Sequence, residues 1–172
     1  NHLLEDGVQA DHIIEIDLEH PITADLINPI KLDNYIRSNL VSDGKMNYVL
    51  IDEIQYCGKA LPEGFDLSKI HPDDRERMFV DFYRVLNGLR TTPNVDVYVT
   101  GSNSRLLASD VATEFRGRGY VIQVTPLSFA EFMPLRTTEQ NTIKIIEEYL
   151  LYGGLPDCVL ATSTESKEAY LK

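Results

Sequence analysis

The sequence has few cysteines, no cluster of basic residues and no long apolar segment. Its two cysteines, Cys57 and Cys158, are far apart and do not form a Cys-x-x-Cys pair. The simplest interpretation is a reduced, cytoplasmic protein, with a single disulfide as the alternative. No apolar run approaches the roughly 20 residues that cross a bilayer, and no basic segment followed by an apolar one opens the chain. We therefore expect neither a membrane span nor a signal peptide.

Basic residues are scarce relative to acidic ones. The 172 residues include 16 Lys and Arg against 27 Asp and Glu, which gives a formal net charge of -11. Because nonspecific binding to nucleic acid depends on contacts between cationic side chains and phosphates, we do not expect this segment to bind nucleic acid. With 43% hydrophobic residues, the composition is that of a globular protein with a sizeable core.

Apolar patterning predicts an alternation of strands and helices. Ile14, Ile16 and Leu18 alternate with acidic residues, which is typical of a half-exposed strand near a sheet edge. Strands are predicted over residues 12–19, 47–55, 95–100 and 120–124. Helices are predicted over residues 30–40, 72 to about 89, 105–115 and 140–152, with short ones after Pro126 and Pro156 and a last one capped by Thr162 and Glu165.

This order of elements predicts the α/β class, with a parallel sheet between two helical layers. We expect residues 1–136 to form this three-layer α/β/α core. Only helices are predicted after about residue 139, so residues 137–172 are expected to begin a helical lid or a second domain. Residues 1–6 look like the last turn of a helix that Gly7 ends, which suggests a truncated chain.

Two adjacent carboxylates, Asp52 and Glu53, follow the apolar run from Tyr48 to Ile51. In open α/β sheets, ligands bind at the carboxyl ends of the strands. One carboxylate there can hold Mg²⁺ through its waters, and a second can polarise the water that attacks a phosphate. The alternative is a pair of solvated loop acids, but the buried strand that precedes them favours a functional site.

Three further residues are candidates for the same site. Asn103 follows the strand over 95–100, and its amide can orient a water or contact a γ-phosphate; the alternative is a helix N-cap. Arg116 and Arg118 lie on a glycine-rich corner after the predicted helix. Their guanidinium groups could reach a phosphate on a neighbouring subunit, or they could simply be solvated residues at a helix C-terminus.

These motifs together resemble those of the AAA+ ATPases. Tyr-Val-Leu-Ile-Asp-Glu-Ile-Gln at 48–55 resembles a Walker B strand, and Val-Tyr-Val-Thr-Gly-Ser-Asn-Ser-Arg-Leu-Leu at 97–107 resembles a sensor 1 strand. Phe-Arg-Gly-Arg at 115–118, Val-Thr-Pro-Leu-Ser-Phe-Ala-Glu-Phe at 124–132 and Tyr-Gly-Gly-Leu-Pro at 152–156 are similar to one branch of that superfamily. This branch comprises uncharacterised prokaryotic ATPases with a C-terminal nuclease-like domain of unknown function.

The resemblance implies a P-loop NTPase fold that uses ATP and Mg²⁺. It implies that Asp52 binds Mg²⁺, that Glu53 activates the attacking water and that Asn103 is the sensor in contact with the nucleotide. It also implies that Arg116 or Arg118 is an arginine finger.

One motif of that superfamily is missing from the sequence. Its phosphate-binding loop reads Gly-x-x-x-x-Gly-Lys-Ser/Thr, but Gly44-Lys45 is followed by Met46 and Gly58-Lys59 by Ala60. We interpret the chain as a fragment that lacks this Walker A loop and the first strand. The absence of that strand leaves unpaired strand edges, through which the fragment is expected to form a homo-oligomer; a strictly monomeric sedimentation profile would contradict this.

Three interpretations of the function remain open. The first is the ATP-binding and hydrolysing core of an AAA+ ATPase, inactive in this fragment. The second is a nucleotide-dependent switch or scaffold that mediates protein–protein interaction. The third is an α/β interaction domain that binds no nucleotide. The remaining titratable residues suggest no other site: the four histidines, His2, His12, His20 and His71, have no metal-ligand spacing and are expected at the surface.

The missing loop leads to a prediction about nucleotide affinity. We expect the 172-residue chain alone to bind ATP weakly, because the backbone amides and the lysine that hold the phosphates are absent from it. Titration with a fluorescent ATP analogue measures this directly, and binding at micromolar concentration would contradict the expectation.

Overall fold

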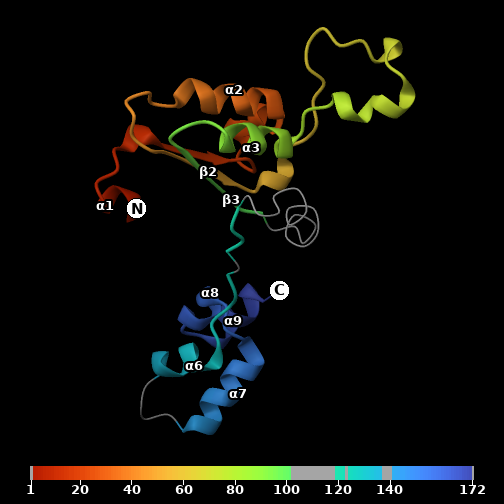
Figure 1. Ribbon diagram of the computed structural model, residues 1–172. Helices are drawn as coiled ribbons and strands as arrows, with labels where there is room; N and C mark the ends of the chain where they lie inside the picture. The colour runs from red at the N-terminus through yellow and green to blue at the C-terminus, as the bar shows by residue number, and fades with distance from the viewer. Residues whose placement is uncertain (1, 102–118, 123, 137–140, 172) are drawn as a thin grey trace. The chain divides into compact units, whose positions relative to one another are not determined.

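A computed structural model of the chain describes residues 2–101, 119–122, 124–136 and 141–171. The chain divides into two compact units, residues 1–119 and 120–172, which are described separately (Figure 1). The division into domains expected from the sequence, 1–136 and 137–172, remains a prediction. None of the helices in the described ranges has the length and apolar character needed to cross a bilayer.

The first unit is built on a three-stranded parallel sheet. Its strands are β1 (Ile13–Asp17), β2 (Asn47–Asp52) and β3 (Val95–Val99), in the order β1-β2-β3. The central strand β2 pairs with both neighbours, with Val49 level with Ile14 on one side and Val97 on the other. The predicted α/β class with a parallel sheet is therefore confirmed.

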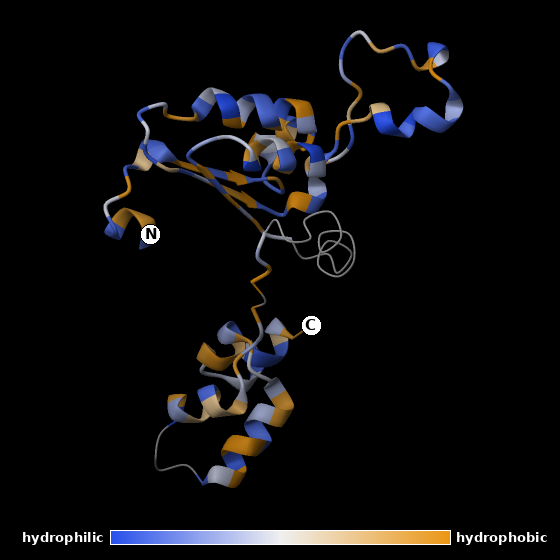
Figure 2. Ribbon diagram, viewed as in Figure 1, coloured by the Kyte–Doolittle hydropathy of each residue, from blue (hydrophilic) through white to orange (hydrophobic). Residues whose placement is uncertain are grey.

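Helices α2 (Pro29–Asn39) and α3 (Phe82–Arg90) lie side by side over one face of this sheet (Figure 1). Each begins at a side-chain cap: the Asn28 side chain accepts from the backbone N–H of Ile30 at 3.0 Å, and Asp81 accepts from that of Arg84 at 3.0 Å. Apolar residues of the strands pack with those of the two helices, and hydrophobic and hydrophilic residues both appear along the strands in Figure 2. The core comprises Ile14, Ile16, Leu18, Leu32, Ile36, Val49, Ile51, Ile54, Cys57, Val85, Leu86 and Leu89.

The remaining elements of this unit are short. The helix α1 (His2–Glu5) ends before Gly7, whose φ of 87° is the left-handed conformation expected of a helix stop. The helix predicted over 105–115 lies outside the described residues. The described residues of this unit also form six 3₁₀ turns: η1 (Ala10–His12), η2 (Pro21–Ile27), η3 (Ile54–Tyr56), η4 (Leu67–Lys69), η5 (Pro72–Asp74) and η6 (Glu76–Met78).

The single helix predicted from Pro72 to about residue 89 is wrong in its first half. Only η5 and η6 form there, and the chain then extends so that Val80 pairs with Ala60 in an antiparallel bridge. The two backbone hydrogen bonds of this bridge are 2.9 and 2.8 Å long. The extended segment and the Asp81 cap together delay the start of the helix until Phe82.

The second unit is helical. It contains α6 (Phe129–Phe132), η7 (Met133–Leu135), α7 (Thr142–Tyr152), α8 (Pro156–Leu160) and α9 (Thr164–Tyr170). Its buried cluster is small and consists of Phe132, Ile145 and Val159. The cap of the last helix is Ser163, whose hydroxyl accepts from the N–H of Ser166, and not the predicted Thr162.

A shared carboxylate also stabilises the second unit. Glu148 of α7 accepts two hydrogen bonds from Arg136, of 3.0 and 2.7 Å, and a third from Lys167 of α9. The side chains of Arg136, Glu148 and Lys167 are only 14%, 20% and 13% exposed. Hydrogen bonding to Arg136 lowers the pKa of Glu148, so this carboxylate stays ionised and ties three segments together.

The strand predicted over 120–124 is not observed in the residues that are described there. Tyr120, Val121, Ile122 and Val124 are 101%, 63%, 75% and 89% exposed, and no described strand pairs with them. The apolar, β-branched pattern is typical of a strand, but a strand needs a neighbour to accept its hydrogen bonds.

The Gly153-Gly154 pair has two separate steric roles. Gly153 ends α7 with a φ of 71°, and its N–H donates to the carbonyl of Tyr149 at 2.8 Å. Gly154 approaches the chain at Leu127, whose N–H donates to the Gly154 carbonyl at 2.8 Å. A Cβ atom at position 154 would lie 1.9 Å from the carbonyl oxygen of Leu127, so only glycine fits there.

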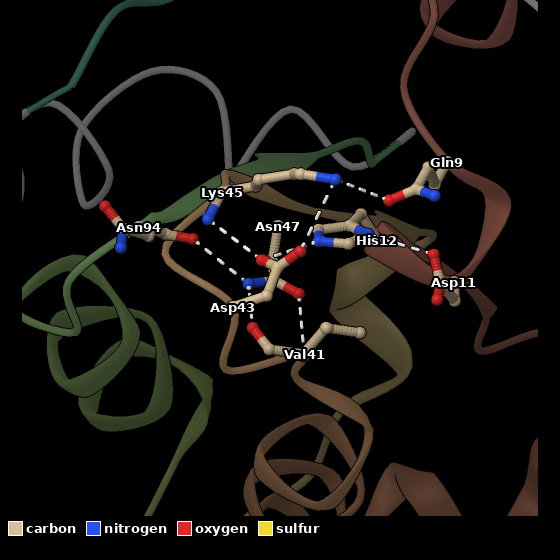
Figure 3. Close-up of polar contacts among 8 residues, drawn as sticks. All are labelled: Gln9, Asp11, His12, Val41, Asp43, Lys45, Asn47 and Asn94. Carbon is tan, nitrogen blue, oxygen red and sulfur yellow. Dashed lines mark hydrogen bonds and ion pairs between the residues drawn. The ribbon is translucent and has the colours of Figure 1, made fainter.

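A buried polar cluster closes the amino-terminal edge of the sheet (Figure 3). His12 was expected at the surface but is 2% exposed. Its Nδ1 lies 2.9 Å from Asp11 Oδ1 and its Nε2 lies 3.0 Å from Asp43 Oδ1. Both carboxylates are acceptors, so the doubly protonated imidazolium suits this position. Beside it, the Asn47 side chain bonds to the backbone of Val41 at 2.9 and 3.0 Å.

This cluster predicts a pH-dependent stability. Hydrogen bonds to Asp43 and Asp11 raise the pKa of His12 above 6.5, and the bond to His12 lowers the pKa of Asp43 from 3.8 to about 2. The contribution of His12 is complete below about pH 6.5 and is lost as pH rises through its raised pKa; that of Asp43 is lost only as pH falls toward about 2.

We therefore expect Asp43→Asn to lower the Tm more at about pH 5 than at about pH 9. Thermal unfolding followed by circular dichroism at both pH values measures the difference. Glu15→Gln, at an exposed position on β1, is the control that should show no such dependence. An equal loss of Tm at both pH values in Asp43→Asn would rule out the charged form of His12 as the cause.

Candidate functional site

The predicted acidic pair lies at the carboxyl end of the central strand. Asp52 is the last residue of β2 and is exposed, while Glu53 is half-buried and directly precedes η3. Glu53 has φ 54° and ψ 47°, the left-handed conformation, which costs a residue with a side chain about 1–2 kcal/mol. Strain of this kind is typical of residues that a functional site holds in a fixed orientation.

Thr100, directly after β3, fixes the carboxylate of Asp52. Its hydroxyl donates to Asp52 Oδ1. The same hydroxyl accepts from the backbone N–H of Glu53 at 3.3 Å, and this N–H also approaches Asp52 Oδ1 at 3.2 Å. The backbone of Thr100 adds a bond of 2.9 Å to the carbonyl of Ile51 and accepts one of 3.0 Å from Ile54. The ends of β2 and β3 are therefore joined around Asp52.

The side chain of Glu53 is held by a different partner. Gln55, within η3, donates from Nε2 to Glu53 Oε2. The two adjacent acids thus differ in burial, backbone conformation and hydrogen-bond partners. This difference allows one to serve as a cation ligand and the other as a base.

Neither Thr100 nor Gln55 was among the site residues predicted from the sequence. The signal for Thr100 was its place at the end of the strand beside the one that carries Asp52. The signal for Gln55 was its position two residues after Glu53. The three other predicted residues, Asn103, Arg116 and Arg118, lie outside the described residues, so their place in the site stays a prediction.

The side chains at this edge of the sheet suit Mg²⁺ better than a metal ion whose ligands all come from the protein. In the part of the chain that the structure describes, no group of three or more His, Cys, Asp or Glu side chains is placed to bind a metal ion. Mg²⁺ usually keeps several waters and binds only one or two carboxylates together with phosphates, which a single exposed Asp52 can provide. Cys57 is no nucleophile here, because burial raises the pKa of its thiol to about 12.

Comparison with known proteins identifies the family. Residues 1–133 match the family model AAA_14, described as an AAA domain. The chain belongs to this family, which is of the AAA-like P-loop ATPase type, so it is an ATPase-like nucleotide-binding domain. Domains of this type bind their nucleotide typically together with Mg²⁺.

Two relatives are similar to the chain. An uncharacterized protein of Haemophilus influenzae is 28% identical over 164 residues, which is 94% of this chain and 36% of that protein. An uncharacterized protein of Methanocaldococcus jannaschii is 31% identical over 87 residues, which is 45% of this chain and 20% of that protein. The chain thus spans about a third or less of the length of these relatives. No solved structure matches the chain significantly.

The junction at Thr100 leads to a stability prediction. Thr100→Val keeps the branched shape but removes the hydroxyl that bonds to Asp52 and Glu53. We expect it to lower the free energy of unfolding by about 1 kcal/mol, measured by urea denaturation. Thr100→Ser keeps the hydroxyl and should lose less. If the two variants are equally stable, the hydroxyl does not join the strand ends.

Proposed function

We propose that the chain is part of the ATP-binding and hydrolysing core of an AAA+ ATPase. The arrangement of Asp52 and Glu53 supports this proposal most strongly. They are adjacent at the carboxyl end of a central parallel strand, yet Thr100 holds Asp52 and Gln55 holds Glu53. The family to which the chain belongs supplies the substrate class, since its members are ATPase-like domains.

In this proposal the two acids divide the work of phosphoryl transfer to water. Asp52 holds Mg²⁺, directly or through its waters, and the bound ion supplies positive charge next to the phosphates. Glu53 accepts a proton from the attacking water. The hydrogen bond from Gln55 keeps its carboxylate in one orientation, which a base needs when it must take a proton from one direction.

The finer assignments rest on the resemblance to AAA+ motifs. The strand that ends in Asp52-Glu53 is assigned as Walker B, Asn103 as the sensor that contacts the nucleotide, and Arg116 or Arg118 as the arginine finger. We further propose that the whole protein belongs to the prokaryotic branch with a C-terminal nuclease-like domain and acts in the cytoplasm. A relative that extends well beyond the matched region leaves room for such a domain.

Hydrolysis and nucleotide-dependent switching predict different results for Glu53→Gln in the full-length protein. We expect turnover of ATP to fall by about 10²–10⁴-fold, the usual contribution of a general base. Binding of ATP should persist, because the side chain keeps its size. A phosphate-release assay and a nucleotide-binding titration measure the two properties separately.

Glu63→Gln is the matched control, because Glu63 is an exposed acid in the loop before η4. Unchanged turnover in Glu53→Gln would remove Glu53 from the mechanism. If the protein keeps its cellular function with turnover abolished, the switch or scaffold interpretation replaces the hydrolytic one. Failure of the full-length protein to bind ATP with Mg²⁺ would favour an interaction domain that needs no nucleotide.

A further inference from the structure

A cavity lies between α2 and α3, and none of the candidate ATPase residues contributes to its lining. Its volume is about 260 Å³. Ile30 of α2, Val85 of α3, and Pro62 and Val80 from the connecting segment provide apolar walls. The bridge between Ala60 and Val80 holds this connecting segment in place. The cavity therefore has an ordered, mainly apolar lining.

Two arginines bring positive charge to this lining. Arg37 donates from Nε to Asp33 Oδ2 at 2.9 Å and from Nη1 to Thr92 Oγ1 at 3.4 Å. Arg84 donates from Nη1 to the carbonyl oxygens of residues 77 and 79, at 3.3 and 3.0 Å. Among the described residues, neither arginine has an acceptor for its Nη2 hydrogens. Asp33 is the one acid in the lining, which leaves one positive charge uncompensated.

The carboxylate of Asp33 is only half satisfied. Its Oδ2 accepts from Arg37, but its Oδ1 is buried and has no hydrogen-bond partner in the described structure. Buried polar atoms are almost always paired with protein or ordered water. Because Oδ1 is covered by protein atoms, the polar groups that the lining offers to a ligand are the donors of the two arginines.

A glycine in the last turn of α3 contributes to this arrangement. Gly88 is the seventh of the nine residues of this helix, and glycine is less favourable than alanine within a helix. A Cβ atom there would lie 3.1 Å from Arg37 Nη2. The absence of a side chain at Gly88 therefore lets the guanidinium group of Arg37 lie against the α3 backbone at the cavity.

We propose that this cavity binds an apolar residue that carries a free α-carboxylate. The α-carboxylate accepts from Arg37 and Arg84, and the apolar side chain packs against Ile30 and Val85. A free apolar amino acid and the C-terminal residue of a peptide share this chemistry. The proposal is independent of ATP hydrolysis, because it uses none of the residues assigned to that reaction.

The test is a titration of ¹⁵N-labelled protein followed by its amide NMR signals. The probes are L-leucine, a short peptide that ends in Ala-Leu with a free carboxylate, and the same peptide with a C-terminal amide. We expect saturable shifts of the Val80, Val85 and Gly88 amides with one or both free carboxylates, and none with the amidated peptide.

Saturation by leucine alone identifies a free amino acid as the ligand, and saturation by the peptide alone identifies a C-terminus. No saturable shift with either, as for a cavity that holds only water, overturns the proposal, and so does equal binding of the amidated peptide.

Two matched comparisons test the assigned groups. Arg84→Met and Arg90→Met each remove one positive charge from α3, but Arg90 does not line the cavity. We expect Arg84→Met to raise the Kd at least about tenfold and Arg90→Met to leave it unchanged. If Arg84→Met fails to fold, the wild-type protein still tests the charge contact with L-leucinamide, which lacks the carboxylate of leucine. Where leucine is the ligand, leucinamide should bind at least about tenfold more weakly. Where the peptide is the ligand, the amidated peptide makes the same comparison. Equal affinity would exclude the role of the two arginines.

Discussion

The parallel pairing of β2 with both of its neighbours is the constraint on which the first unit depends. The alternation of the strand places Val49 and Ile51 in the core, and the same pairing places Asp52 beside Thr100. Backbone bonds continue the ladder beyond the strand ends, from Leu18 to the Asp52 carbonyl at 3.2 Å and from Thr100 to the Ile51 carbonyl. A slip of one residue in the register would turn Val49 and Ile51 out of the core and would move Asp52 away from Thr100. The register of β2 therefore determines both the core packing and the geometry of the acidic pair.

Sequence patterns predicted the elements that local physics determines. The uninterrupted apolar run before Asp52 and the alternation around Ile16 became β2 and β1, because those periods reflect burial. The helix expected from Pro72 began ten residues late, at Phe82. Apolar residues there have helical spacing, but pairing of Val80 with Ala60 and capping by Asp81 outweighed that spacing. One of these competing contacts joins residues that are distant in sequence. A local sequence pattern carries no information about such a contact.

Long-range polar contacts were the part of the site that sequence reasoning could not supply. Thr100 and Asp52 are brought together only by strand pairing, and the left-handed backbone of Glu53 has no sequence signature of the kind that glycine gives. His12 shows the same limit: histidine is common at surfaces, and its burial depends on Asp43, which follows far along the chain. The acidic pair was found because its two members are adjacent and follow a buried strand.

The close approach of Gly154 to Leu127 has a consequence for reading distant homologues. Of the two glycines, the first has φ 71° and ψ -166°, a backbone conformation that essentially only glycine adopts. The second tolerates no side chain, because the obstacle is a backbone carbonyl that cannot rotate away. A homologue with any other residue at this position must have rebuilt the contact between α7 and the segment before α6. Both positions therefore require glycine, but for different reasons: the first reports how α7 ends, and the second reports whether the helical unit retains this backbone contact.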